Sequence, residues 1–314
     1  MTNPRSEALW RRIRGGVVPA MATPIRTGGE EVDLDRVPSL VDFLVSREVA
    51  GLFVGGTTGE GILLSLPERM KLHEASVRAA RGRVPVLAHV GDNTTANAVR
   101  LARHAHDIGA DAVVAVTPTF YPVPDPSLVK HYAAIGEATP LPLFAYDIPQ
   151  MAANGISPAA LREMCKSVPN FAGIKSSRSD AHALVQFVAC LTPSAGLLAG
   201  FEPTALGSLT LGAQGLVSGL ATAVPEPVVA LVRAVARAEV EEARRQQSII
   251  NAILDLVPAN ARIGCLKAIL QARGVAVGEP VPPRPHGNPA LWPKIQPLLR
   301  GAGPSEVPIK AAHA

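Results

Sequence analysis

The feature of this sequence that most constrains its fold is an eightfold alternation of short apolar segments with longer segments of helical periodicity. A short apolar run bounded by turn-forming residues is typical of a buried β-strand. The expected strands are residues 17–22, 51–54, 84–89, 112–116, 141–146, 171–174, 195–199 and 216–218. Strands of this kind, buried on both faces, predict a parallel sheet covered by helices.

Each expected strand precedes a segment in which apolar residues recur at helical spacing, as at Val37, Leu40, Val41 and Leu44 in the first. The expected helices are 35–46, 67–80, 95–108, 127–138, 158–167, 180–190, 204–211 and 225–236. Eight strand–helix units in a row predict an α/β fold of the (β/α)8, or TIM-barrel, type. A doubly wound open sheet is the alternative, but no GxGxxG follows the first strand and no linker divides the chain.

The chain divides into a barrel and an appendage. We expect the barrel at residues 15–237 and a C-terminal helical extension at 238–300, with helices at 239–257, 260–273 and around 292–299. Residues 301–314 are small and polar, and we expect them to be disordered. With 314 residues, of which 47% are hydrophobic, the chain can bury a large core as one principal domain.

Composition argues against several classes of function. The net charge is +4, but lysine and arginine are spread along the chain, so we expect no nucleic-acid partner. Cys165, Cys190 and Cys265 lie far apart without a CxxC pair or a signal-peptide pattern, which favours reduced thiols in the cytoplasm. No apolar run reaches the length of a membrane span, and the eight histidines show no metal-ligand spacing, so we expect neither a membrane partner nor a metal.

In a barrel of this type the chemistry comes from side chains at the C-terminal ends of the strands. Lys175 is the most unusual of them, because an apolar strand runs directly into it and lysine is rarely buried without a partner. Burial disfavours the ammonium form, which makes a lysine amine a nucleophile able to form a Schiff base with a carbonyl substrate. The plainer alternative is a lysine that reaches solvent or pairs with an acid.

Other strand ends also carry functional groups. The loop from Gly55 to Glu60, which includes Gly56, Thr57 and Thr58, can point backbone amides and hydroxyls at a carboxylate or phosphate, although an ordinary tight loop fits the same residues. Tyr146 lies one strand from Lys175 and could transfer protons, or it could be a half-buried aromatic with a satisfied hydroxyl. The remaining candidates at the ends of strands four, six, seven and eight are Tyr121, Ser177, Glu202 and Ser218.

Three of these segments resemble the motifs of one family. GGTTGE (55–60), YDIP (146–149, usually YNxP) and GIK (173–175) occur in the order and spacing found in the class I, Schiff-base lyases typified by N-acetylneuraminate lyase and dihydrodipicolinate synthase. The likeness runs from about Gly15 to the end of the C-terminal helices. It implies a TIM barrel that uses pyruvate or another 2-oxo acid and needs neither a metal nor an organic cofactor.

The resemblance also implies a role for individual residues. Lys175 would form the imine, Tyr146 would shuttle protons, and Thr57 and Thr58 with the loop amides would hold the substrate carboxylate. It further implies a homotetramer built as a dimer of dimers, with a 2-oxo acid and an aldehyde as small-molecule partners.

The sequence departs from the family pattern at three places. Met151 stands where the synthase has an arginine for the aldehyde substrate's carboxylate, which disfavours dihydrodipicolinate synthesis. Of the polyol contacts of sialic-acid lyases, Glu202 alone is retained, followed by Pro203. Phe120 occupies the position of the relay tyrosine that reaches a neighbouring subunit, with Tyr121 next to it.

The leading hypothesis is therefore a pyruvate-dependent aldolase or lyase that cleaves or forms a 2-oxo-3-deoxy acid through an imine on Lys175. The alternatives are a dihydrodipicolinate synthase-like condensation, a dehydratase or deaminase that uses the same imine, and a binding module that retains the pocket without turnover. The identity of the aldehyde distinguishes members of such a family, and the sequence does not specify it.

Overall fold

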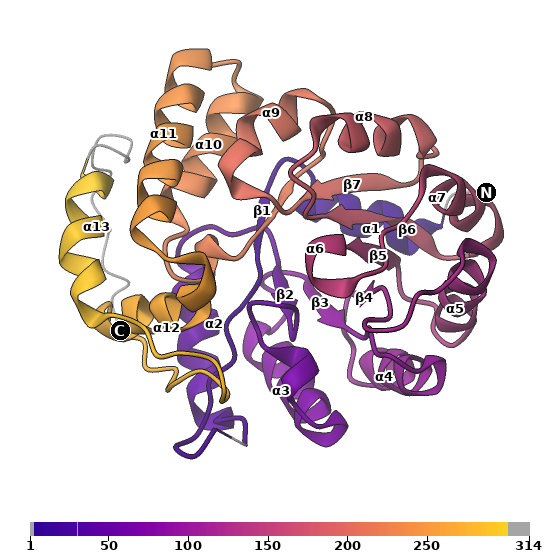
Figure 1. The fold of residues 1–314 in the computed structure, drawn as a ribbon, viewed down its shortest axis with the longest axis horizontal. Helices are drawn as coiled ribbons and strands as arrows, with labels where there is room; N and C mark the ends of the chain where they lie inside the picture. Colours follow the sequence, from indigo (N-terminus) through magenta and orange to yellow (C-terminus); the bar gives the residue numbers. More distant parts are fainter. Residues whose placement is uncertain (1–2, 30, 301–314) are drawn as a thin grey trace.

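The computed structural model describes residues 3–29 and 31–300, and it contains the expected barrel. Eight parallel strands are ordered β1-β8-β7-β6-β5-β4-β3-β2, and a bridge between Ala20 and Phe53 brings β1 and β2 together (Figure 1). The strands are β1 (Val17–Pro19), β2 (Leu52–Val54), β3 (Val86–His89), β4 (Ala112–Val116), β5 (Leu143–Asp147), β6 (Phe171–Ser176), β7 (Gly196–Ala199) and β8 (Leu216–Ser218). The predicted fold class is confirmed, and the strand positions agree with the apolar segments.

Helices surround the strands, as the periodicity predicted. They are α2 (Val37–Val45), α3 (Leu66–Ala80), α4 (Thr95–Asp107), α5 (Asp125–Glu137), α7 (Pro158–Ser167), α8 (Ala181–Cys190), α9 (Ala205–Thr210) and α10 (Glu226–Ala236). Several begin at a serine, threonine or aspartate whose side chain accepts from a backbone N–H of the first turn, such as Ser65, Thr94 and Asp180. A short helix that the periodicity did not predict, α6 (Pro149–Ala152), follows β5 directly.

One further helix was missed. Residues 4–13 look polar in sequence but form α1 (Pro4–Ile13), which buries Leu9, Trp10 and Ile13 against side chains of the barrel interior. The indole Nε1 of Trp10 donates to the carbonyl of Ala172 at 3.1 Å, and its ring packs edge-on against Phe144. The apolar spacing at 9, 10 and 13 was the available signal, and it was masked by three arginines.

The strands alternate between the barrel interior and the layer beneath the helices, because successive side chains of a strand point to opposite faces. In β5, Phe144 and Tyr146 belong to the interior cluster, while Leu143 and Ala145 pack beneath the helices. Asp147, the residue after Tyr146, therefore points outward like Leu143 and Ala145. Whether a strand-end side chain points inward or outward decides which other side chains it can contact.

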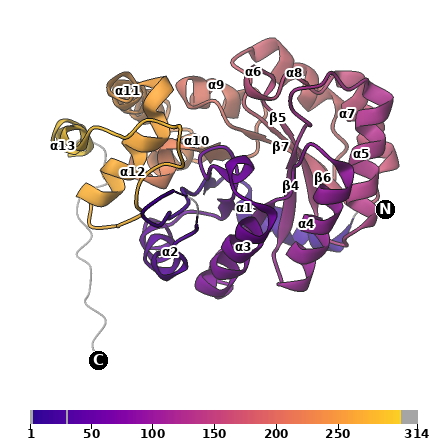
Figure 2. The same ribbon diagram turned by 60° about the horizontal axis from the view of Figure 1, so that its bottom comes forward.

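The extension consists of α11 (Val240–Leu256), α12 (Arg262–Ala272) and α13 (Trp292–Leu299), which lie to one side of the barrel (Figure 2). In residues 3–29 and 31–300, no single helix has the length and hydropathy of a membrane span, and α11 and the segment 259–272 meet that criterion only as a pair bent by 78°. All three cysteines are free thiols. The expectation of a disordered tail concerns residues 301–314, which lie outside the described residues.

Candidate active site

Lys175 is inside the barrel because of a bulge in β6. Phe144 of β5 pairs with Gly173 and Leu143 with Phe171, so β6 contains one extra residue between these pairs. Gly173 has a φ of +148°, and a Cβ there would lie 2.0 Å from the carbonyl oxygen of Gly196. The bulge shifts the alternation by one residue, so Ile174 packs beneath the helices and Lys175 points inward.

The Lys175 side chain is almost fully buried, with 4% of its surface exposed. Its amine nitrogen lies 3.7 Å from the centre of the Tyr146 ring and 4.7 Å from that of Phe53. The sequence placed Lys175 at the end of the strand, whereas β6 continues through it to Ser176. Among the described residues no carboxylate forms an ion pair with Lys175, so the alternative of a lysine paired with an acid is not what the structure shows.

Tyr146 and Thr57 connect the lysine to the glycine-rich loop. The Tyr146 hydroxyl lies 3.1 Å from Oγ1 of Thr57, and either atom can be the donor. Tyr146 is held from behind by edge-on contacts with Phe53 and His89. The loop is closed on itself, because the amide of Gly61 donates to the carbonyl of Gly56. Lys175, Tyr146 and Thr57 therefore form one contiguous group.

Thr58 faces the end of β8 instead. A Cβ built on Gly219 would lie 2.8 Å from Thr58 Oγ1 and 3.6 Å from Glu202 Oε1, so these three residues surround one point. Glu202 Oε1 accepts from the Ser218 hydroxyl at 3.1 Å and from the amides of Gly219 and Leu220 at 2.8 and 3.1 Å. This oxygen of Glu202 is therefore committed to the turn after β8.

Ser177 approaches the lysine from the other side. A Cβ on Gly200 would lie 2.4 Å from Ser177 Oγ and 3.1 Å from Lys175 Cε, so both side chains border the same glycine. The carbonyl of Ser177 accepts from the Gln150 amide, which fixes the loop after β6 to α6.

A buried ion pair holds the outer side of this region. Asp147 is fully buried and accepts from Nε and Nη2 of Arg178 at 2.6 and 3.1 Å, from the Ser176 hydroxyl and from the amide of Ile156. Asp147 stands where the motif usually has asparagine, and its carboxylate pairs with Arg178. Met151, in contrast, points into solvent and is 64% exposed.

A second ion pair joins the loop to the extension. Glu60 adopts a left-handed backbone (φ +56°), and its carboxylate lies 2.7 Å from Nζ of Lys267 in α12 and accepts from the amide of Val281. Both side chains are buried, and burial lowers the pKa of Lys267 although Glu60 opposes the shift. The extension therefore holds the loop that carries Thr57 and Thr58.

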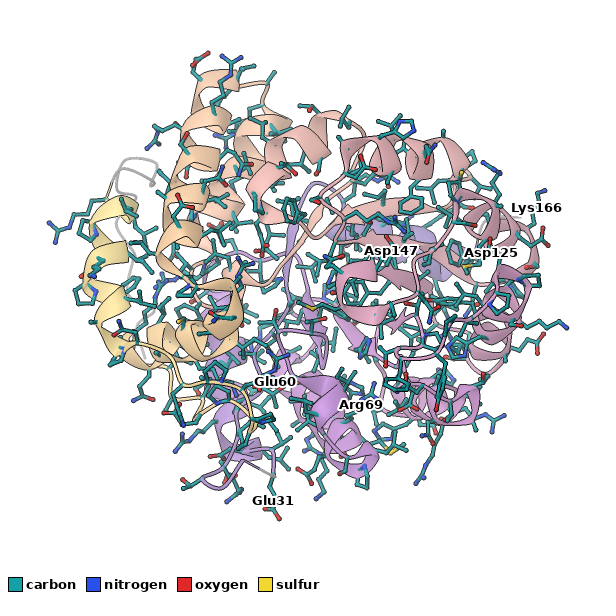
Figure 3. All side chains as sticks on the ribbon, viewed as in Figure 1. Glu31, Glu60, Arg69, Asp125, Asp147 and Lys166 are labelled. Carbon is teal, nitrogen blue, oxygen red and sulfur yellow. The ribbon has the colours of Figure 1, made fainter. Side chains whose placement is uncertain are left out.

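Behind Tyr146 lies a buried cluster of His89, His73 and Arg69. Arg69 donates to the carbonyls of His89 and Gly91 at 3.0 and 2.8 Å. Burial and the nearby Arg69 charge lower the pKa of His73 to about 3 and that of His89 well below its usual value. Both imidazoles are therefore neutral. Figure 3 shows Arg69, Glu60 and Asp147 around the centre of the view, with Glu31 and Lys166 at its edge.

Tyr121 is not brought to this group within one chain. It is 73% exposed, Phe120 beside it is 79% exposed, and their rings contact each other edge-on. Phe120 has a φ of +70°, a strained conformation for a bulky residue that is found mostly where function requires it.

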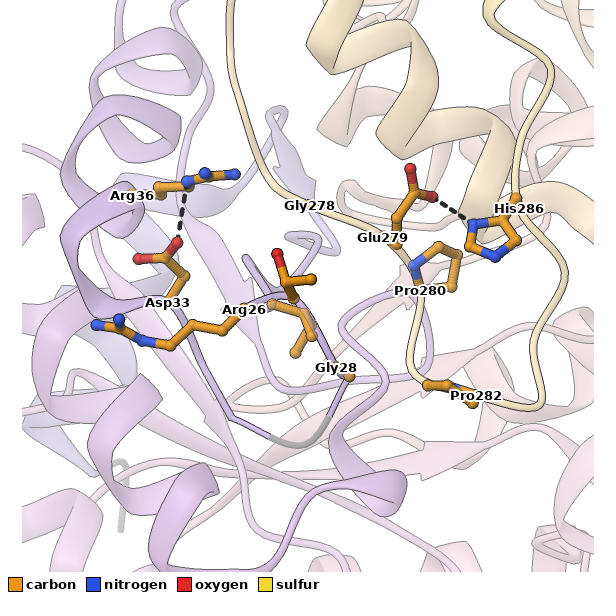
Figure 4. A pocket seen from close by; sticks show the side chains of 12 residues that line it. Arg26, Gly28, Asp33, Arg36, Gly278, Glu279, Pro280, Pro282 and His286 are labelled. Atoms are coloured by element: carbon orange, nitrogen blue, oxygen red, sulfur yellow. Dashed lines mark hydrogen bonds and ion pairs between the residues drawn. The ribbon is translucent and has the colours of Figure 1, made fainter.

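The groove shown in Figure 4 lies elsewhere. It has a volume of about 620 Å³ and runs between the loop 25–36 and the segment 278–286. Among its charged side chains Arg36 pairs with Asp33 and His286 with Glu279, while Arg26 pairs with Asp35 outside the groove. None of the strand-end residues above lines it, so we do not regard it as the active site.

Sequence reasoning missed Phe53, His89, Arg178, Lys267 and Arg262, the last described below. His89 ends an expected strand and could have been found by position. Lys267 and Arg262 carry no local signal, because both belong to α12, which reaches the barrel only in the folded chain.

Several known proteins are similar to this chain in sequence and in fold. Residues 14–287 match the dihydrodipicolinate synthetase family. A 4-hydroxy-tetrahydrodipicolinate synthase of Phenylobacterium zucineum is 40% identical over 212 residues, 67% of this chain and 71% of that protein. An N-acetylneuraminate lyase of Rhizobium meliloti is 32% identical over 263 residues, 84% of this chain and 87% of that protein. The structure of a sialic acid aldolase of Ruminococcus gnavus, with its catalytic lysine mutated, superposes with a TM-score of 0.88 at 26% identity, covering 93% of this chain and 97% of that one.

Proposed function

Because this chain belongs to the dihydrodipicolinate synthetase family, we propose that it is a pyruvate-dependent class I lyase that cleaves or forms a 2-oxo-3-deoxy acid through a Schiff base on Lys175. The observation that carries the proposal is the contiguous group of Lys175, Tyr146 and Thr57 inside the barrel. A buried amine that has no acidic partner within residues 3–29 and 31–300, beside a phenol and a threonine, provides a nucleophile and a route for protons.

The reaction follows from these positions. The amine of Lys175 attacks the C2 carbonyl of the substrate, and the Tyr146 phenol gives its proton to the leaving hydroxyl group, so that water departs and a protonated imine and a phenolate remain. The Tyr146 phenolate, hydrogen bonded to Thr57, then takes the proton of the C4 hydroxyl. The C3–C4 bond then breaks, its electrons move to the imine, and the aldehyde leaves. Protonation of the enamine at C3 and hydrolysis release pyruvate and restore Lys175.

The remaining polar groups orient the substrate. Amides of the 55–60 loop with the Thr57 and Thr58 hydroxyls would hold the carboxylate, and Gly56 keeps this loop close to Phe53. Ser177, Ser218 and Glu202 border the space in which the remaining carbon atoms of the substrate would lie. Since Glu202 Oε1 already accepts three hydrogen bonds, only Oε2 is left for a substrate hydroxyl.

Synthase activity remains the second candidate, favoured by the 40% identity to the synthase of Phenylobacterium zucineum. Met151 argues against it, because a thioether cannot bind a carboxylate as a guanidinium does.

Product analysis separates the candidates. The protein would be incubated with several 3-deoxy-2-oxo acids, and pyruvate and aldehyde would be measured. An aldolase releases both in equal amounts, whereas a dehydratase releases water, a deaminase releases ammonia, and both keep the carbon chain intact. Absence of any product from all substrates would support a binding module and contradict the proposal.

We also propose a homotetramer in the cytoplasm, in which Phe120 and Tyr121 reach a neighbouring subunit. Their exposure supports this, because large exposed aromatics mark contact surfaces. Tyr121 would then supply the second phenol of the proton relay. Sedimentation of the purified protein tests the assembly, and a monomer at assay concentration would exclude it.

A further inference from the structure

We propose that Arg262 selects aldehydes that carry an anionic group, a carboxylate or a phosphate, at the end distant from the reacting carbonyl. The inference rests on the proposed function, and it adds the chemical class of the aldehyde half. The thioether of Met151 cannot bind a second anionic group of the substrate. If the substrate carries such a group, a cation from another part of the fold has to bind it.

Arg262 is the first residue of α12 and lies at the ends of β7 and β8. Its Nη1 is 3.9 Å from Oε2 of Glu202. The other oxygen of Glu202 contacts the turn after β8, next to Thr58. Glu202 itself follows Gly200, which borders Lys175. The guanidinium is thus connected through one carboxylate to the loops that surround the amine.

The guanidinium of Arg262 donates no hydrogen bond within residues 3–29 and 31–300. Its Nε is shielded from solvent without an acceptor, and over residues 3–29 and 31–300 its single polar contact is the long ion pair with Glu202. Arg178 of the barrel, by comparison, donates to Asp147 and to the carbonyl of Ile156. The Nε of Arg69 also lacks an acceptor, but its Nη2 donates to the carbonyls of His89 and Gly91. Buried polar groups nearly always have partners, so an arginine that lacks them is a candidate for binding a ligand.

The chemistry of the site favours an anion. A guanidinium offers parallel N–H donors that match a carboxylate or phosphate. Arg262 also starts a helix of 11 residues, whose N-terminus adds a partial positive charge. The opposing charge is Glu202, whose Oε1 is hydrogen bonded to the turn after β8 and whose Oε2 lies 3.9 Å from the guanidinium, beyond hydrogen-bond distance. With 34% of the side chain exposed, the guanidinium is accessible without being free in solvent.

The test is aldol addition of pyruvate to three aldehydes, namely succinic semialdehyde, glyceraldehyde 3-phosphate and neutral glyceraldehyde. In Arg262→Gln we expect KM for the anionic aldehydes to rise about 10- to 100-fold, with KM for glyceraldehyde and for pyruvate changed less than about 2-fold. Arg262→Lys keeps the charge but loses the bidentate geometry, and it should lie in between. The two anionic arms show whether carboxylate or phosphate is preferred.

Arg244→Gln is the matched control, because Arg244 is an exposed cation of the same extension that pairs with Glu241. It should leave all three KM values unchanged. Equal losses for neutral and anionic aldehydes, or no loss for either, would overturn the role of Arg262. So would a wild-type protein that binds pyruvate covalently but uses only neutral aldehydes, and that result would leave the proposed function intact. If Arg262→Gln does not fold, as judged by its thermal melt, Arg262→Lys decides.

Discussion

Lys175 and Tyr146 are register partners on neighbouring strands, and the lysine nitrogen lies 3.7 Å from the centre of the tyrosine ring. The contact exists because the bulge at Gly173 turns Lys175 inward. The glycine of the Gly173-Ile174-Lys175 motif therefore has a structural function: the bulge that it forms decides that Lys175 points into the barrel.

Replacing Gly173 should destroy this arrangement. In Gly173→Ala the new Cβ would meet backbone of β7, and alanine does not tolerate a φ of +148°. We expect loss of soluble folded protein or a melting temperature lowered by several degrees, with no detectable activity. Gly207→Ala is the control, because Gly207 lies in α9 with open space around it, and this change should be neutral or slightly stabilising. Normal activity in Gly173→Ala would refute the role of the bulge.

Removing the Tyr146 hydroxyl should slow the chemistry without unfolding the protein. For Tyr146→Phe we expect kcat to fall about 10²- to 10⁴-fold, the usual contribution of a positioned acid–base group. Tyr132→Phe is the control, since Tyr132 is a buried tyrosine whose hydroxyl donates to the carbonyl of Ala115. It should cost about 1 kcal/mol of stability and leave kcat unchanged. Equal kcat values for the two variants would contradict the proton-transfer role.

The ion pair between Glu60 and Lys267 should couple the extension to the carboxylate-binding loop. Lys267→Met leaves a buried carboxylate without its partner, which costs about 3–5 kcal/mol. We expect a lower melting temperature and a higher KM for pyruvate, because Glu60 ends the loop that carries Thr57 and Thr58. Adding Glu60→Gln to this variant should recover part of the stability. A double variant less stable than Lys267→Met would show that the two residues act independently.

Stability should fall in acid because of the buried histidines. The pKa of His73 is lowered from 6.5 to about 3 in the folded protein, so between these values the unfolded chain binds more protons. The stability that comes from keeping His73 neutral is fully present above the unfolded pKa and is lost progressively as pH falls below it, with a loss of about 2 kcal/mol at about pH 5. The free energy of unfolding in urea would be measured at about pH 5 and about pH 7.5. In His73→Leu the difference between these two free energies should be smaller than in the wild type by about 2 kcal/mol. The exposed His106→Gln should not change the difference, and an unchanged pH dependence in His73→Leu would refute the assignment.

The sequence contained enough information for the barrel, because every strand–helix unit has its own local periodicity. It also placed Lys175, Tyr146 and Thr57 at strand ends, and the structure brings them together. It could not reveal α1, whose apolar face is narrow and surrounded by arginines.

The ion pairs and Arg262 were also beyond sequence reasoning. Glu60 and Lys267 lie 207 positions apart in the sequence, and their contact depends on how α12 packs on the barrel. Asp147 and Arg178 are closer in sequence. Only the alternation of side chains along β5 shows that Asp147 points outward, toward Arg178 and away from Lys175. Long-range packing decides these contacts, and no local pattern encodes it.

The central claim is that the amine of Lys175 captures a 2-oxo acid. The most direct measurement is reduction with borohydride in the presence of pyruvate, followed by mass spectrometry of the intact protein and of its peptides. We predict one stable adduct per chain on the peptide that contains Lys175, none on the equally buried Lys267, and none in Lys175→Met. An unmodified protein, or an adduct on any other lysine, would contradict the account.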